Sequence, residues 1–153
     1  RHYGNLIDQS DVILRINAAP TIGFEDDVGT RTHVRVGWAQ GMYDAVNAGV
    51  MTQDELLVMT TPNNHQGQPD WRYTLPVNQY VNNLGSHHTL LCVNQDWAGA
   101  LQRTLLHHQG EWASTGFVAL ALAVAVAKSV GAPPVKVFGF GACPPCAKYY
   151  HCG

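Results

Sequence analysis

Residues 114–140 have the sequence STGFVALALAVAVAKSVGAPPVKVFGF, and this stretch decides the fold class. It opens with Ser114 and Thr115, which are N-capping residue types, continues with an Ala-rich apolar run about four turns long, and ends at Gly131 and two prolines. The pattern predicts a buried helix. Val135–Phe140 then has the apolar pattern of a strand, which supplies the helix-to-strand half of a βαβ crossover. We therefore expect an α/β fold with a mostly parallel sheet and helices on its faces.

The rest of the chain alternates strand patterns with helical or irregular segments in the same way. Strands are predicted at Asp11–Asn17, Thr32–Gly37, Leu56–Thr60 and Thr89–Val93, the last of a buried type. A helix is predicted at Asp96–Leu106, whose apolar residues have helical spacing. Asn63–Val81 contains two prolines and no sustained periodicity, so we expect a surface loop there, with one short helix near Val77–Asn83.

The composition excludes several function classes. The chain has 153 residues, enough for one domain, and its formal net charge of −2 without a basic block lacks the electrostatic footprint of a nucleic-acid partner. The longest apolar run, Phe117–Ala127, is about half of the roughly 20 residues that a bilayer span requires. No hydrophobic signal region opens the chain, so we expect no membrane contact from these residues. Both ends are abrupt and lack a polar tail, so we expect residues 1–153 to be a single but incomplete domain.

Two interpretations of Ser114, Thr115 and Gly116 are open. As the first residues of a helix, they bring two hydroxyls and several unpaired backbone N–H groups to the positive end of a helix dipole, which suits an anion. Ser and Thr are also the usual N-capping residues in any protein. Residue type alone favours the ordinary cap.

The cysteines near the C-terminus form a second candidate site. Cys143 and Cys146 have Cys-x-x-Cys spacing and are followed by His151 and Cys152, which suits a zinc half-site, a redox pair or a local disulfide. A redox motif of the thioredoxin type should open a helix, and two prolines stand between these cysteines instead. Unpaired thiols are the remaining interpretation.

Other residue patterns argue against common chemistries. The acidic run from Glu25 to Asp27 has no spaced Asp-x-Asp partner, and adjacent carboxylates diverge, so a solvated acidic loop is favoured over a metal site. The chain has no P-loop, no Gly-x-Gly-x-x-Gly and no Gly-x-Ser-x-Gly motif, which removes the commonest NTPase, dinucleotide and hydrolase interpretations. The residues by themselves indicate an α/β ligand-binding domain.

Three segments resemble the motifs of the eukaryotic-type sialyltransferases. Tyr3–Thr32, YGNLIDQSDVILRINAAPTIGFEDDVGTRT, is similar to the large sialylmotif. Trp112–Gly141 is similar to the small sialylmotif, in the expected order, and Lys148–His151 falls where the short third motif of the family lies.

The resemblance implies a three-layer α/β/α sandwich, a GT-A-like variant of the nucleotide-sugar transferase fold. It implies a glycosyltransferase that moves sialic acid from the donor CMP-sialic acid to the terminal sugar of a glycoprotein or glycolipid acceptor. The transfer would proceed with inversion and without a metal or other cofactor. The family also implies a catalytic domain in the Golgi lumen, attached to the membrane by a span outside these residues.

In the large motif and the first part of the small motif, the resemblance assigns donor-binding roles to four residues. Asn17 matches the asparagine that contacts the nucleotide. Ser114, Thr115 and Gly116 match the segment that touches the cytidine and the sugar carboxylate of the donor.

Three further donor-binding residues are implied near the C-terminus. Gly141 matches a position where the backbone approaches the nucleotide. Lys148 stands where the family usually has His, and its charge would meet the donor phosphate. Tyr149 follows it in the third motif.

The sequence departs from the family pattern in two ways that bear on function. The disulfide cysteine of the large motif would precede Arg1 and its partner position falls near Ala127, so the family disulfide is not expected. The motif with the histidine base would follow Gly153, so the catalytic base is unknown.

These departures leave three alternatives to a sialyltransferase. The first is transfer of a related ulosonic acid such as Kdo from its own CMP donor. The second is a catalytically inactive relative that binds a nucleotide or glycan. The third is an interaction protein in which Cys143, Cys146, His151 and Cys152 hold a structural zinc ion.

Overall fold

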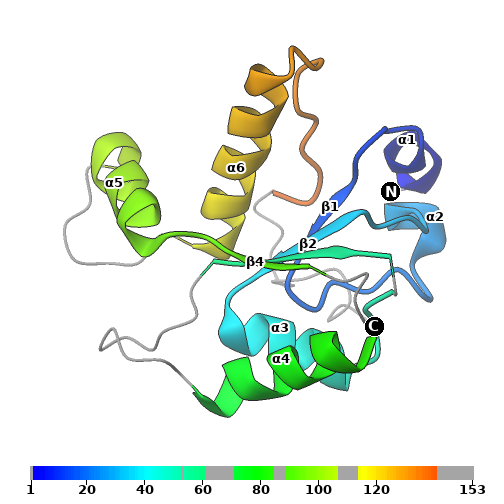
Figure 1. The fold of residues 1–153 in the computed structure, drawn as a ribbon. Helices are drawn as coiled ribbons and strands as arrows, with labels where there is room; N and C mark the ends of the chain where they lie inside the picture. The colour runs from blue at the N-terminus through cyan, green and yellow to red at the C-terminus, as the bar shows by residue number, and fades with distance from the viewer. Residues whose placement is uncertain (1, 53, 61–70, 85–88, 107–113, 141–153) are drawn as a thin grey trace.

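The computed structural model describes residues 2–52, 54–60, 71–84, 89–106 and 114–140 (Figure 1). Helices and strands alternate along most of the chain, as the sequence predicts. In chain order they are α1 (Gly4–Asp8), β1 (Leu14–Ile16), α2 (Glu25–Val28), β2 (Val34–Gly37), α3 (Ala39–Asn47), β3 (Leu56–Met59), α4 (Trp71–Leu84), β4 (Leu90–Cys92), α5 (Gln95–Leu106) and α6 (Thr115–Ser129).

The four strands form one sheet in the order β1-β2-β3-β4, and every neighbouring pair is parallel. Leu14 pairs with Val34, and Val34 pairs with Leu56, so the strands start at one level. The carboxyl ends of all four strands therefore meet at one edge of the sheet, which we call the carboxyl edge. This arrangement confirms the predicted α/β fold with a parallel sheet.

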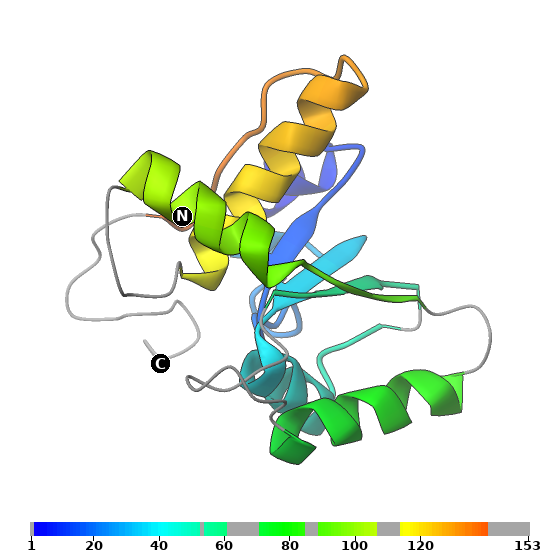
Figure 2. The ribbon, with the colours of Figure 1, turned by 60° about the vertical axis from the view of Figure 1, so that its left-hand side comes forward.

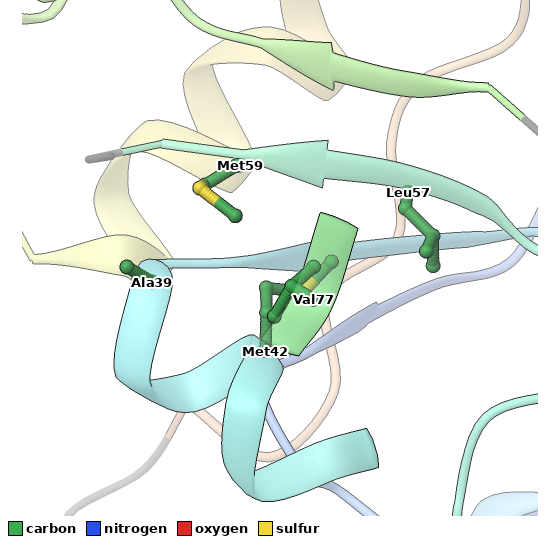
Figure 3. Close-up of a cluster of buried hydrophobic side chains, with 5 residues drawn as sticks. All are labelled: Ala39, Met42, Leu57, Met59 and Val77. Carbon is green, nitrogen blue, oxygen red and sulfur yellow. The ribbon is translucent and has the colours of Figure 1, made fainter. Parts of the chain in front are cut away.

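Helices cover both faces of the sheet, which gives the expected α/β/α layers (Figures 1 and 2). The sheet face that α3 and α4 cover contributes to one apolar cluster, formed by Ala39, Met42, Leu57, Met59 and Val77 (Figure 3). The opposite face packs against α6 through Val36, Val58 and Ala119. Since Leu57 and Met59 point to one layer and Val58 to the other, β3 is apolar on both sides, as parallel strands usually are.

Two helices differ from the sequence expectation. In place of a short helix near Val77–Asn83, α4 has 14 residues and contains Pro76. Val77, whose side chain is fully buried, packs on Met42 of the cluster under α3, and this packing compensates for the amide that proline lacks. The helix α3 was not predicted at all, although its buried residues Ala39, Met42 and Ala45 recur at helical spacing.

The helix α6 begins where the sequence predicts, but it is not buried along its length. Val118 and Ala119 are 3% and 1% exposed on the sheet, whereas Val126 and Val130 are 53% and 71% exposed. Its residues are apolar on every side, so the sequence contains no polar face to mark the solvent side. Among the helices that the structure describes, none combines the length and the apolar character needed to cross a membrane.

Two strand predictions also need correction. Val135–Phe140 forms no strand, because it makes no backbone hydrogen bonds with the sheet in the described ranges, and Phe140 is 59% exposed. The strand β4 was predicted to be buried, yet Leu91 is 47% exposed because β4 has only β3 as a described neighbour.

The first prediction tests the layer under α3 and α4. Replacing Leu57, which is 1% exposed, by Ala is expected to lower the free energy of unfolding by about 2–5 kcal/mol, because the change leaves a cavity in packed surroundings. The matched change Leu105→Ala, at a residue 57% exposed on α5, should cost less than about 1 kcal/mol. Urea unfolding of both variants measures the difference, and equal losses would contradict the described core.

Candidate functional site at the carboxyl edge of the sheet

The start of α6 and the end of β1 lie together at the carboxyl edge. A Cβ atom placed on Gly116 would lie 3.8 Å from Cδ1 of Ile16, the last residue of β1. Asn17 follows Ile16 directly, so the structure brings Asn17 to the same edge as Ser114, Thr115 and Gly116. Ligands of parallel α/β sheets bind at this kind of edge.

Asn17 has an unusual backbone and a buried side-chain oxygen. Its φ angle of 52° lies in the left-handed region, and its N–H donates to the carbonyl of Val36 over 2.9 Å. Its Oδ1 is buried without a hydrogen-bond partner among the described residues. The amide side chain occupies the space left by two glycines, because a Cβ at Gly37 would lie 3.3 Å from Oδ1 and one at Gly41 would collide with it. An unsatisfied buried oxygen costs about 1–3 kcal/mol, so a ligand that donates to it would recover that free energy.

Behind Asn17 lies a buried ion pair that the sequence analysis missed. Arg35 and Glu55 are 1% and 0% exposed, and Arg35 Nε donates to Glu55 Oε2 over 2.6 Å while Nη2 donates to Oε1 over 3.1 Å. Nη2 also donates to the Val50 carbonyl over 3.1 Å, and Nη1 donates to the carbonyls of Asn17 and Ala19 over 2.8 and 3.2 Å. These contacts use all five N–H donors of the guanidinium group. The available signal was a charged residue between two valines of the predicted strand Thr32–Gly37.

The surroundings of Glu55 complete this polar cluster. Thr52 donates to Glu55 Oε1 through its amide at 3.1 Å and its hydroxyl at 3.3 Å. The pKa of Tyr80 on α4 is raised, first by burial and then by the negative charge of Glu55, while the charge of Arg35 opposes the shift. The raised pKa keeps the Tyr80 phenol protonated and uncharged at neutral pH.

At the start of α6, the structure confirms the ordinary cap, and the anion-binding interpretation stays a prediction. Ser114 is the N-cap, because its Oγ accepts from the amide of Phe117 over 3.2 Å. The amides of Thr115 and Gly116 have no acceptor in the described part of the chain, as expected for the first turn of a helix. The cap thus leaves two N–H groups at the positive end of the dipole for an anion.

Gly116 also lies against an aromatic ring. A Cβ at this position would come within 3.0 Å of Cε1 of Phe140, so a larger residue would push the ring away. This contact brings the residue before Gly141 to the start of α6. Gly141, Lys148 and Tyr149 themselves lie outside the described residues, as do Cys143, Cys146, His151 and Cys152.

Another polar cluster, between α1 and α2, shares no residue with the carboxyl edge. It surrounds an open cavity of about 430 Å³, lined by His2, Asn5, Asp8, Glu25, Asp26 and Thr30. The Asp8 carboxylate accepts from the Thr30 amide at 2.8 Å, the Thr30 hydroxyl at 2.9 Å and the Arg31 amide at 3.2 Å.

The run Glu25–Asp27 is exposed, as predicted, although it forms the short helix α2 instead of a loop. No three His, Cys, Asp or Glu side chains within the described ranges are grouped so that they could hold a metal ion.

The chain is similar to known proteins over nearly its whole length. Residues 1–151 match the family described as glycosyltransferase family 29 (sialyltransferase). A curated relative from Gallus gallus, CMP-N-acetylneuraminate-beta-galactosamide-alpha-2,3-sialyltransferase 1, is 29% identical over 146 residues, which are 92% of this chain and 40% of the relative.

Two solved structures share the fold. One is described as the crystal structure of a mammalian sialyltransferase, with a TM-score of 0.56 and 19% identity over 82% of this chain and 46% of that one. The other is a mammalian sialyltransferase in complex with Gal-beta-1-3GalNAc-ortho-nitrophenol, with a TM-score of 0.54 and 21% identity over 82% and 45% of the two chains. The chain thus spans less than half the length of these relatives.

The N-cap of α6 is tested by a pair of serine variants on one helix. Ser114→Ala is expected to lower the free energy of unfolding by about 0.5–2 kcal/mol, because the Phe117 amide loses its acceptor. Ser129→Ala removes a hydroxyl that only donates to the Val126 carbonyl at the other end of α6, and it should change stability by less than about 0.5 kcal/mol. Chemical denaturation measures both values, and equal effects would mean that the cap contributes nothing.

Asp8 is expected to make stability depend on acid pH. Burial acts to raise the pKa of its carboxyl, but the hydrogen bonds from Thr30 and Arg31 outweigh burial and hold the pKa below its ordinary value of 3.8. Because the folded pKa is the lower one, the carboxylate adds stability above pH 3.8 that is lost as the pH falls through the folded pKa. The gap in unfolding free energy between wild type and Asp8→Asn should therefore narrow toward low pH. The exposed Asp11, changed to Asn, is the control, and a gap that does not vary with pH would contradict the assignment.

Proposed function

Because this chain belongs to glycosyltransferase family 29, the sialyltransferases, we propose that its carboxyl edge binds CMP-sialic acid as the donor for transfer to a glycan. The observation that carries the proposal is the juxtaposition of Asn17 with the start of α6. Among the described residues, the buried Oδ1 of Asn17 and the amides of Thr115 and Gly116 have no hydrogen-bond partner, and Gly116 lies against Ile16, the residue before Asn17. A CMP-sugar has N–H and O–H donors on its base and ribose and anionic groups on its phosphate and sugar acid, so it complements both.

The residues take separate roles in this proposal. Asn17 binds the nucleotide, and the amides of Thr115 and Gly116 hold an anionic group of the donor, with the cap Ser114 keeping the helix start in place. By their place in the motifs, Gly141, Lys148 and Tyr149 are proposed to complete the donor site, and the charge of Lys148 suits the donor phosphate.

The proposed reaction is a single displacement. The acceptor hydroxyl oxygen bonds to the anomeric carbon of sialic acid, the bond from that carbon to the phosphate oxygen breaks, and CMP leaves with the bonding electrons. The acceptor proton passes to a general base, to which we assign no residue. A single displacement inverts the anomeric centre. The negative charge that develops on the phosphate of CMP would be stabilised by the positive charge of Lys148.

The acceptor and the setting are proposed from the relatives. One similar structure holds a galactoside, Gal-beta-1-3GalNAc-ortho-nitrophenol, and a terminal sugar of a glycoprotein or glycolipid is the corresponding acceptor here. The family further supports a metal-independent reaction in the Golgi lumen, with residues 1–153 as one part of a catalytic domain.

Binding of cytidine nucleotide is the first test. We expect calorimetric titration to show CMP binding at least about tenfold more tightly than UMP, because a site built around hydrogen bonds rejects an analogue that cannot form them. Asn17→Ala should weaken CMP binding by about 5–30-fold, the loss expected for one hydrogen bond to a buried group. The matched control is Asn47→Ala, at an exposed asparagine at the end of α3, which should leave CMP affinity unchanged. Equal affinities for CMP and UMP would overturn the proposal.

Transfer is then tested in a single turnover with CMP-sialic acid and Gal-beta-1-3GalNAc, with product detected by mass. Sialylated product supports the enzyme. CMP binding without product identifies a nucleotide-binding relative, and product only with CMP-Kdo moves the proposal to the related ulosonic acid, whose carboxylate the same helix start would accept.

A further inference from the structure

Asn17 contacts groups that belong to two other elements, β2 and α3. Its N–H is bound by the carbonyl of Val36, and its amide side chain occupies the space beside Gly37 and Gly41. Its own carbonyl accepts from Arg35 Nη1 over 2.8 Å. With a φ of 52°, Asn17 lies in the left-handed region, which asparagine tolerates better than most L-residues.

Arg35 holds two points of the same turn. Besides the Asn17 carbonyl, Nη1 donates to the carbonyl of Ala19 over 3.2 Å, so one guanidinium nitrogen binds the chain on both sides of residue 18. The turn is closed from within by the Ala19 amide, which donates to the Ile16 carbonyl over 3.3 Å. The backbone conformation of this turn, and with it the orientation of the Asn17 side chain, therefore depends on the position of the Arg35 guanidinium group.

Arg35 is itself immobilised from the other side. Glu55 accepts from Nε and Nη2 in the parallel two-bond geometry that fixes the plane of a guanidinium group. The Val50 carbonyl accepts a hydrogen bond from the other N–H of Nη2. Thr52 in turn binds Glu55 through two hydrogen bonds. A rigid connection thus runs from the loop before β3, across β2, to the residue that faces the proposed donor.

We infer that Arg35, braced by Glu55, is the positioning residue that holds Asn17 in its donor-binding conformation. The inference rests on the proposed function, because it concerns how the same site binds its nucleotide. Lysine could keep the charge of Arg35, but a single ammonium group cannot bind Glu55 and three backbone carbonyls. The alternative is a pair that only stabilises the fold, and the two roles differ in how they affect nucleotide affinity.

The experiment removes both Arg35 and Glu55, so that neither is left as an unpaired buried charge. Arg35→Met combined with Glu55→Met replaces both buried groups by apolar side chains of similar size, a change that proteins often tolerate. We expect the double variant to fold, by circular dichroism, and to bind CMP about tenfold more weakly by calorimetry, since its Asn17 is no longer held in place. In a background of Asn17→Ala, the same double substitution should have no further effect on CMP affinity, because its effect passes through the Asn17 side chain.

A second variant tests the position of Asn17 without touching the ion pair. Gly41→Ala places a methyl group where the Asn17 amide lies, and it should lower CMP affinity to the level of Asn17→Ala while the helix α3 keeps its stability. Gly99→Ala is the matched control. Gly99 also lies inside a helix, α5, and among the described residues an added Cβ there meets only the end of the Arg103 side chain, at 3.3 Å.

The outcomes separate this inference from the proposed function. If wild type does not bind CMP, the proposed function fails. If wild type binds CMP and Asn17→Ala weakens binding, but the folded double variant binds as wild type does, the positioning role alone is overturned. An equal loss of affinity with and without the Asn17 side chain also overturns it, because the ion pair would then act on the whole fold.

Discussion

Arg35 carries its guanidinium group into the interior of the protein, where each N–H needs an acceptor because water does not reach it. Glu55 supplies two acceptors, and the carbonyls of Asn17, Ala19 and Val50 supply the others. Removing one partner of such a pair leaves a buried charge, at a cost of about 3–5 kcal/mol. This requirement ties β2 to the turn after β1 and to the loop before β3.

The parallel sheet places the turn that binds Arg35 at the candidate functional site. Since β1 and β2 run in the same direction, the turn that Arg35 holds lies at the carboxyl edge. The helix α6 packs on the face of β1 and β2 opposite α3 and starts beside Ile16. The buried Oδ1 of Asn17 and the amides of Thr115 and Gly116, which have no partner among the described residues, lie at the same edge of the sheet because two layers of helix pack on it, although almost a hundred residues separate them in the chain.

Local patterns were enough to predict much of this arrangement. The strands β1, β2 and β3, the helix α5 and the Ser114 cap all lie where apolar spacing or capping chemistry predicts them. Where such signals were weak, prediction failed. The proline and the absence of periodicity concealed α4, which depends on Val77 packing against Met42. The apolar character of α6 suggested full burial, but the sheet covers only its first turns, and Val126 is exposed.

The amino-acid sequence by itself determined the α/β class, the parallel sheet, the start of α6 and, through its resemblance to the sialylmotifs, the family. These features depend on neighbouring residues or on motifs that are continuous in the chain. Only the tertiary structure decided that Arg35 and Glu55 form a buried pair, that Asn17 lies between Gly37 and Gly41, and that the segment Val135–Phe140 stays outside the sheet. Each of these depends on contacts between residues far apart in the chain, whose free energy arises only once the layers have packed and excluded water.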